Sequence, residues 1–203
     1  MASREAGSDH AGTLLALEHD PVITVSNRPG AAEHVLASSE LLARHGVALA
    51  RTDRGGDVTY HGPGQVVVYT VIDLKRLRVG LHEHLRIMEE AVISTLGVFG
   101  VRAGRDESAT GVWVGDGPSA KKICAMGVRV RRWIALHGLA LNVTTDLRHF
   151  ELIVPCGLVG RPVTSLRAEL GDGCPPWDTV ADRLTDNLRR RFLEDASDSS
   201  DVM

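Results

Sequence analysis

Two helical stripes, separated by several short runs of strand-forming residues, constrain the fold of this chain most strongly. In the first stripe, apolar side chains recur at spacings of three and four from Leu81 to Phe99, the repeat of a helix that buries one face. The second stripe runs from Trp177 to Phe192 with the same spacing. Both stripes are interpreted as parts of the core, and neither as a binding site.

The remaining apolar runs are short and are punctuated by Gly and Pro, which is typical of β-strands. They are 13–18, 22–25, 47–50, 58–60, 65–74, 112–114, 123–133 and 134–143. The first two runs flank the turn His19-Asp20-Pro21 and are expected to pair with each other, whereas Glu33 to His45 is expected to be helical. Because strands and helices do not alternate regularly, the sequence predicts an α+β domain with a mixed or antiparallel sheet packed with helices.

The size of the chain fits one domain. With 203 residues, of which 43% are hydrophobic, it can bury one substantial core, and we expect a single domain over residues 1–193. After Phe192 the sequence becomes acidic and polar, so residues 194–203 are predicted to form a disordered acidic tail.

Composition also argues against several classes of partner. The formal net charge of -3 and the aromatic fraction of 4% do not favour a nucleic-acid binder. No apolar run is long enough to span a bilayer and the start of the chain lacks a signal core, so no membrane partner is expected and the protein is predicted to be cytoplasmic. Three widely spaced cysteines match neither a disulfide framework nor paired zinc ligands, and no metal is predicted.

A glycine-rich segment, Arg54 to Gln65, is the densest candidate for a binding loop. It has the sequence Arg-Gly-Gly-Asp-Val-Thr-Tyr-His-Gly-Pro-Gly-Gln, and its glycines allow the backbone to approach a ligand and offer its amides. On glycine spacing alone, a pair of tight turns between strands is the favoured alternative, because the segment matches neither a P-loop nor a dinucleotide fingerprint. Arg54 and His61 shift the balance towards binding.

A second candidate is Lys122, which begins a strand-like run that continues to Arg132. Strand alternation puts Lys122 on the same face as Val128 and Val130, and a lysine in a poorly solvated site is usable as an acid and base near neutral pH. The alternative is that Gly127 breaks the register and leaves Lys122 as a surface charge. Lys121 is expected to face solvent.

A third candidate is Cys156, in the turn Val154-Pro-Cys-Gly-Leu158. Cysteine is a good nucleophile once a nearby cation stabilises its thiolate, and amides after Gly157 could receive a developing oxyanion. Most free cysteines are nevertheless structural. Cys124 in an apolar strand and Cys174 before two prolines are weaker candidates.

The histidines leave two alternatives open. His137 could serve as a base for Cys156, although a hydrogen-bonded structural role is the more common one. The run His82-Glu83-His84 lacks the spacing of a helical zinc site and is interpreted as a solvated helix face.

Three segments, in this order and separation, resemble the lipoyl (octanoyl) transferase family. They are Arg54 to Gln65, then Lys122 to Gly127 continuing through His137-Gly-Leu-Ala-Leu-Asn142, then Val154-Pro-Cys-Gly157 with Val163-Thr-Ser-Leu166. The resemblance covers roughly Thr13 to Leu170. The chain departs from the family in Ser26-Asn27-Arg28, and in lacking the helix that we expect ahead of the first strand.

The resemblance implies the fold of biotin and lipoate protein ligases, and transfer of an octanoyl or lipoyl group from acyl carrier protein to a lysine of a lipoyl domain. It implies Cys156 as the nucleophile that carries the acyl group and Lys122 as its acid and base, with no ATP or other cofactor. The residues that it implies for substrate binding are Arg54, Gly55, Gly56, Asp57, Val58, Thr59, Tyr60, His61, Ala125, Met126, Gly127, Gly138, Leu139 and Ala140.

The implied partners are acyl carrier protein, the lipoyl domains of 2-oxoacid dehydrogenase E2 subunits and the glycine cleavage H protein. We expect Arg129, Arg131 and Arg132 to meet the acidic carrier protein. Three rival functions remain: an ATP-dependent lipoate ligase, which would not need Cys156; a non-catalytic acyl-binding protein; and a cysteine-histidine hydrolase that depends on His137.

Overall fold

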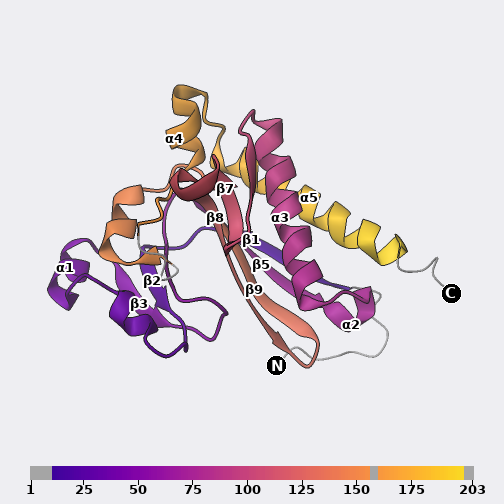
Figure 1. Cartoon of the computed structure of the whole chain (residues 1–203), viewed down its shortest axis with the longest axis horizontal. Coiled ribbons are helices and arrows are strands. Elements are labelled where there is room, and N and C mark those ends of the chain that lie inside the picture. The colour runs from indigo at the N-terminus through magenta and orange to yellow at the C-terminus, as the bar shows by residue number, and fades with distance from the viewer. Residues whose placement is uncertain (1–10, 156–159, 199–203) are drawn as a thin grey trace.

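The main sheet of the molecule has six strands (Figure 1). The computed structural model describes residues 11–155 and 160–198. In spatial order the strands are β1 (Gly12–Leu17), β5 (Gln65–Asp73), β9 (Ile134–Asn142), β8 (Lys121–Arg131), β7 (Ala109–Val114) and β6 (Ala103–Asp106), and every neighbouring pair is antiparallel. The predicted strand runs are confirmed as strands, and the mainly antiparallel sheet is confirmed with them.

A second, smaller sheet has three strands. In it β2 (Val22–Val25) lies between β3 (Ala48–Arg51), to which it is parallel, and β4 (Val58–His61), to which it is antiparallel. The predicted pairing of the first two strands is therefore wrong, because β1 pairs with β5 in the main sheet. The turn at His19-Asp20-Pro21 sends the chain from one sheet to the other instead of closing a hairpin.

Two long helices cover one face of the main sheet (Figure 1). These are α3 (Leu81–Val98) and α5 (Trp177–Asp198), and both predicted stripes are confirmed because Met88, Leu184 and Leu188 are fully buried in one core with the sheet. Helix α5 continues through Asp198, so residues 194–198 of the predicted disordered tail are helical, and residues 199–203 lie outside the described residues. Extending an existing helix requires no new nucleus, which is the step that costs most.

The remaining helical elements are short. They are η1 (Ala31–His34), α1 (Ser39–Arg44), α2 (Leu74–Leu77), η2 (Gly117–Ser119), η3 (Leu147–Leu152), α4 (Leu166–Leu170) and η5 (Gly171–Gly173). The single helix predicted from Glu33 to His45 is thus divided, because the Ser38 hydroxyl accepts a hydrogen bond from the Leu41 amide and starts α1 afresh. Within the described ranges, no helix is long and apolar enough to cross a membrane.

His84 lies in the core, which corrects its predicted place on a solvated helix face. Its ring stacks on Phe192 of α5 with a centroid separation of 5.3 Å, and its Nε2 lies 3.4 Å from the Thr70 hydroxyl. Burial lowers the pKa of His84 to about 4, so the ring is neutral at physiological pH.

Candidate active site

A pocket opens on the face of the main sheet that α3 and α5 leave uncovered. Strand alternation sends Val66 and Val68 into the helix-covered core and sends Val67 and Tyr69 into the pocket. The pocket holds about 600 Å³ of empty space including its open mouth. The sheet therefore separates the core from the site.

Small residues form the floor of this pocket. Ala125 pairs with Ala140 and Gly127 with Gly138 across β8 and β9, and all four line the pocket. A Cβ atom on Gly138 would lie 2.1 Å from the Val68 carbonyl oxygen, so only glycine fits at that position. An extended apolar chain can lie along such a floor.

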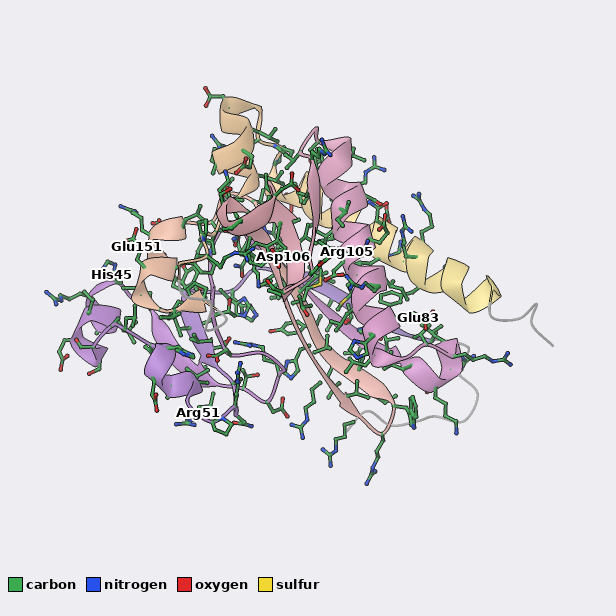
Figure 2. All side chains as sticks on the ribbon, in the orientation of Figure 1. His45, Arg51, Glu83, Arg105, Asp106 and Glu151 are labelled. Atoms are coloured by element: carbon green, nitrogen blue, oxygen red, sulfur yellow. The ribbon has the colours of Figure 1, made fainter. Side chains whose placement is uncertain are left out.

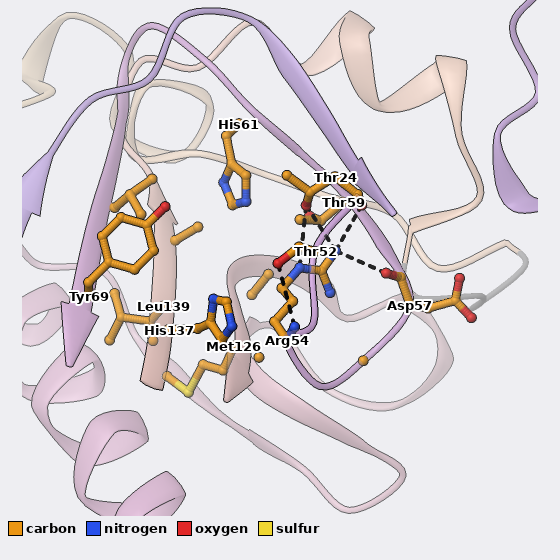
Figure 3. A pocket seen from close by; sticks show the side chains of 16 residues that line it. Thr24, Thr52, Arg54, Asp57, Thr59, His61, Tyr69, Met126, His137 and Leu139 are labelled. Carbon is orange, nitrogen blue, oxygen red and sulfur yellow. Dashed lines mark hydrogen bonds between the residues drawn. The ribbon is translucent and has the colours of Figure 1, made fainter. Parts of the chain in front are cut away.

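The first part of the glycine-rich segment, Arg54 to Asp57, is a loop beside the pocket and is tied to both sheets (Figure 3). The Gly55 amide donates to the Val128 carbonyl at 3.0 Å, which fastens the loop to β8. The Arg54 guanidinium donates to the carbonyl oxygens of Thr24, Gly55 and Asp57 at 2.9 to 3.0 Å. Arg54 thus shapes the loop from within.

Asp57 points away from the pocket although it belongs to the predicted binding segment (Figure 3). Its carboxylate is buried and accepts from His34 Nδ1 at 2.7 Å, with Arg28 at 3.5 Å. Val58 and Tyr60 are likewise buried in the small core. These three side chains support the loop from behind.

A chain of side-chain amides fixes the orientation of His61 at the pocket wall. Asn142 donates to the Thr164 carbonyl at 2.9 Å, so its own oxygen is the group that accepts from Gln65 at 2.9 Å. Gln65 Nε2 also donates to the Tyr60 carbonyl, so Gln65 Oε1 must accept from His61 Nδ1 at 2.8 Å. This order places the His61 proton on Nδ1.

Burial also keeps His61 neutral. Desolvation lowers the pKa of His61 to about 4, and its bond to Gln65 offsets this only in part. The ring lines the pocket opposite Arg54, on the same side as Tyr69 (Figure 3). Tyr69 in turn shares a 2.9 Å hydrogen bond with His19, which orients the Tyr69 hydroxyl at this wall of the pocket.

A smaller cavity of about 270 Å³, lined in part by Lys122, lies beside the pocket. It shares Thr59, Ala125 and Ala140 with the pocket, so the two spaces adjoin, and its further lining is Gln65, Lys122, Asn142, Phe150, Pro155 and Val163. We refer to the pocket and this adjoining cavity together as the channel, and Lys122 lines its cavity end.

Lys122 is buried, with 7% of its surface exposed. Its Nζ donates to the Thr110 carbonyl at 3.1 Å and lies 4.7 Å from the centre of the Trp113 ring. Strand β8 runs unbroken through Gly127, so the alternative in which Lys122 is a surface charge is wrong. Lys121 beside it is partly exposed and forms a 2.5 Å ion pair with Glu169.

The predicted nucleophile, Cys156, lies outside the described residues. The chain on either side of it is described, and Pro155 lines the cavity beside Lys122. After residues 156–159 the chain returns to pair with Lys122, whose amide donates to Pro162 O and whose carbonyl accepts from Thr164 N, each at 2.9 Å. The described chain on either side of residues 156–159 thus lies next to Lys122.

His137 is bound to the loop that covers the pocket. It has a left-handed backbone with φ of 66°, and its Nε2 lies 2.7 Å from Asp53, which also pairs with Arg129. These bonds favour the structural role for His137. Arg129 is engaged there too, so only Arg131 and Arg132 of the predicted docking arginines are exposed without a described ion-pair partner.

The two described cysteines are free thiols with no sign of activation. Cys124 is fully buried, and desolvation raises its pKa to about 12. Cys174 is partly buried near the start of α5. Among the described residues, no cluster of three or more His, Cys, Asp or Glu side chains could hold a metal ion.

Residues 2–189 match the family model described as the lipoyl protein ligase A/B catalytic domain. The chain belongs to this family. A curated octanoyltransferase of Flavobacterium johnsoniae is 46% identical over 88% of this chain and 77% of its own length. Another, from Solibacter usitatus, is 48% identical over 94% of this chain and 83% of its own. Within the lipoyl protein ligase A/B family, the chain is thus an acyltransferase of the octanoyltransferase group.

Solved structures show the fold of the same family. A lipoate-protein ligase A bound with ATP superposes with a TM-score of 0.67 at 22% identity, over 92% of this chain and 73% of that one. A bipartite lipoate protein ligase of Thermoplasma acidophilum, studied with its E2 lipoyl domain, gives 0.68 at 23% identity over 92% and 72%. A biotin protein ligase from Aquifex aeolicus gives 0.51 at 15% identity, over 87% and 70%. The predicted ligase-like fold is confirmed.

Several residues that build this lipoyl protein ligase A/B site were not singled out from the sequence. Thr110 and Trp113 contact the Lys122 amine, and Asn142 with Gln65 fixes His61. The sequence offered little indication of these roles, because each residue stands in or beside a strand and is of a type that is common in strands. Only the fold brings them to the pocket.

Proposed function

We propose that the chain transfers an octanoyl (or lipoyl) group from acyl carrier protein to a lysine of lipoyl domains through a thioester on Cys156, with Lys122 as acid and base. The observation that supports this most is the placement of Lys122. It is buried at the end of a channel floored by Ala and Gly, and the chain that flanks Cys156 leaves and returns beside it.

The chemistry has two steps of similar form. The Cys156 thiolate attacks the carbonyl carbon of the donor thioester, the bond from carbon to the pantetheine sulfur breaks, and Lys122 gives its proton to the departing thiolate. As a free amine, Lys122 then takes a proton from the incoming lysine, whose nitrogen attacks the Cys156 thioester and releases the thiolate. Each intermediate is an activated acyl group, so the proposed reaction uses no ATP, metal or other cofactor.

The pocket suits the acyl chain of such a donor. Its floor is Ala125, Gly127, Gly138 and Ala140, its edges include Met126 and Leu139, and the ring of His61 is neutral. Each methylene of an acyl chain that leaves water there contributes about 0.8 kcal/mol. The backbone of Gly55, Gly56 and Thr59 completes the proposed substrate-binding set.

The proposed partners are acidic carrier proteins and lipoyl domains. A fold relative, the ligase of Thermoplasma acidophilum, has an E2 lipoyl domain as its partner. We extend this to the E2 subunits of 2-oxoacid dehydrogenases and to the glycine cleavage H protein. Arg131 and Arg132 at the β8–β9 turn are exposed and can meet the acidic face of acyl carrier protein.

Intact-protein mass spectrometry tests the covalent intermediate. The wild-type chain is mixed with octanoyl-acyl carrier protein and should gain one octanoyl group that hydroxylamine removes, whereas Cys156→Ser should gain no hydroxylamine-labile group. Cys174→Ser is the matched control and should behave as wild type, because Cys174 lies outside the channel.

Other outcomes identify the rival functions. Octanoylation of a lipoyl domain that requires ATP and survives Cys156→Ser would replace the proposal with a ligase. Saturable acyl binding by a folded chain, with neither adduct nor turnover, would replace it with a binding protein. Water-dependent loss of the acyl group that requires His137 and not Lys122 would indicate a hydrolase.

A further inference from the structure

We infer that Trp113, together with the Asp106–Arg161 ion pair, positions Lys122 for the reaction proposed at Cys156. This inference rests on the function proposed above. Trp113, Asp106 and Arg161 lie outside the predicted catalytic and substrate-binding residues, and they act through Lys122 and through the chain that follows Cys156.

The Trp113 ring forms one wall of the space around the lysine amine. Trp113 is 1% exposed, and its indole Nε1 donates to the Ala109 carbonyl at 3.1 Å, which fixes the plane of the ring. The Lys122 Nζ lies 4.7 Å from the ring centre, within the range of a cation–π contact. A ring held in this way limits the positions that the amine can take.

Strand β7 makes a second contact with the Lys122 amine, through a backbone carbonyl. The Thr110 carbonyl, three residues before Trp113, accepts from Lys122 Nζ at 3.1 Å. The next residue, Gly111, donates its amide to the buried carboxylate of Glu89 on α3 at 3.2 Å, and this anchors the strand at that point. The lysine is therefore aligned by β7 through a carbonyl and a ring.

The Trp113 ring also contacts the side chain of Arg161. Its guanidinium carbon lies 4.2 Å from the ring centre, and its Nη2 donates to Asp106 Oδ2 at 2.5 Å. Asp106 ends β6, beside Arg105 in Figure 2, and the bond from Arg161 is the main reason why the pKa of Asp106 falls to about 2. Asp106 is therefore a carboxylate at any physiological pH, and the ion pair persists.

The position of Arg161 in the sequence connects its contact with Trp113 to the proposed nucleophile. Arg161 follows residues 156–159 closely and immediately precedes Pro162, whose carbonyl accepts from the Lys122 amide. The chain that follows residues 156–159 is thus held on Trp113 by the side chain of Arg161 and on Lys122 by the backbone of Pro162. The same ring contacts both the Lys122 amine and the Arg161 guanidinium.

The test compares Trp113→Leu, Trp113→Phe, Arg161→Met and Arg161→Lys in the full chain. A single-turnover measurement gives the rate at which octanoyl-acyl carrier protein acylates Cys156, and alkylation of Cys156 by iodoacetamide across pH gives the apparent pKa of its thiol. Trp177→Leu is the matched tryptophan control, because Trp177 packs on the main core at the start of α5.

We expect Trp113→Leu and Arg161→Met to slow acylation by about 100-fold, the loss that a displacement near 1 Å can cause, with little change in KM. The alkylation profile should move towards the value of a free thiol, about 8.5, because the Lys122 ammonium is no longer held near the thiolate. Trp113→Phe keeps an aromatic face and should stay within about tenfold of wild type. Arg161→Lys should recover part of the rate lost in Arg161→Met.

A purely structural role would give a different pattern. If Trp113→Leu lowered the melting temperature but left the rate per folded molecule and the alkylation profile as in wild type, the inference would be wrong. Equal losses in Trp177→Leu and Trp113→Leu would also overturn it. Failure of the proposed function is distinguishable, because wild-type Cys156 itself would then not be acylated.

Discussion

Two cations that line the channel, Arg54 at the pocket end and Lys122 at the other, are held in opposite ways. Arg54 donates hydrogen bonds to three backbone carbonyls of its own loop and of β2. Its guanidinium therefore stabilises the shape of the pocket. Among the described contacts, Lys122 Nζ donates to the Thr110 carbonyl and lies over the face of the Trp113 ring. The first arrangement shapes the pocket wall, whereas the second orients the amine that we propose as acid and base.

This difference predicts different consequences for similar substitutions. Removing a cation that organises a loop should cost stability and substrate binding together. Removing a cation that takes part in proton transfer should cost the rate while the fold persists.

The largest effect is expected for Lys122→Met. General acid–base groups contribute about 100- to 10,000-fold, so octanoyl transfer should fall by about 1,000-fold while the melting temperature stays close to that of wild type. Steady-state transfer to a lipoyl domain and thermal unfolding measure the two quantities. Lys121→Met, which breaks the partly exposed pair with Glu169, is the control and should keep its activity. A collapse of the fold in Lys122→Met would contradict the comparison.

Arg54→Met should act mainly on stability. Several charge-assisted hydrogen bonds are lost and the carbonyls of the loop are left without their donor, so the free energy of unfolding should fall by about 3 kcal/mol. KM for the acyl donor should rise because the loop lines the pocket. Urea unfolding and steady-state kinetics measure both. If only kcat changed, Arg54 would belong with Lys122 and the comparison would fail.

Acid should lower the free energy of unfolding through His61, which lines the pocket. The pKa of His61 is about 4 in the folded chain and near 6.5 in the unfolded chain. At a pH between these two values, His61 is protonated in the unfolded chain and neutral in the folded chain. The stability due to neutral His61 is complete above pH 6.5 and is lost as the pH falls towards 4, by about 3 kcal/mol. Urea unfolding at several pH values should show a smaller loss for His61→Asn. Equal slopes would show that His61 does not titrate in this way.

The smallest effect is expected for Asp53→Asn, which breaks the pairs with Arg129 and His137 at the mouth of the pocket. Both partners are partly solvated and exposed ion pairs contribute little, so KM for the acyl donor should change by less than about threefold. A larger change would show that the mouth, and not only Arg54, holds the loop in place.

The sequence predicted what depends on local periodicity. The stripe that contains Met88 and Leu96 became α3, and alternation along β8 correctly put Lys122 among buried residues. The three segments of the resemblance also converge in space as far as they are described. Periodicity is sufficient in these cases because each element buries one face whatever its partner is.

What the sequence could not predict depends on partners far along the chain. The pattern of β1 is that of a strand, but nothing in it distinguishes β2 from β5 as a neighbour. His84 looked solvated because Phe192, which covers it, belongs to the last helix. Trp113 and Arg161 meet for the same reason, since their contact is created by the fold and not by spacing.

The backbone pairing of Lys122 with residues 162–164 has a consequence for the order of synthesis. The amide of Lys122 finds its acceptor only at Pro162, and α5, which covers the sheet, comes later still. A growing chain that ends before Pro162 therefore lacks the acceptor of the Lys122 amide. The surroundings of the proposed acid and base are complete only after these later residues have been synthesised, which is after both strands that carry the floor of the pocket.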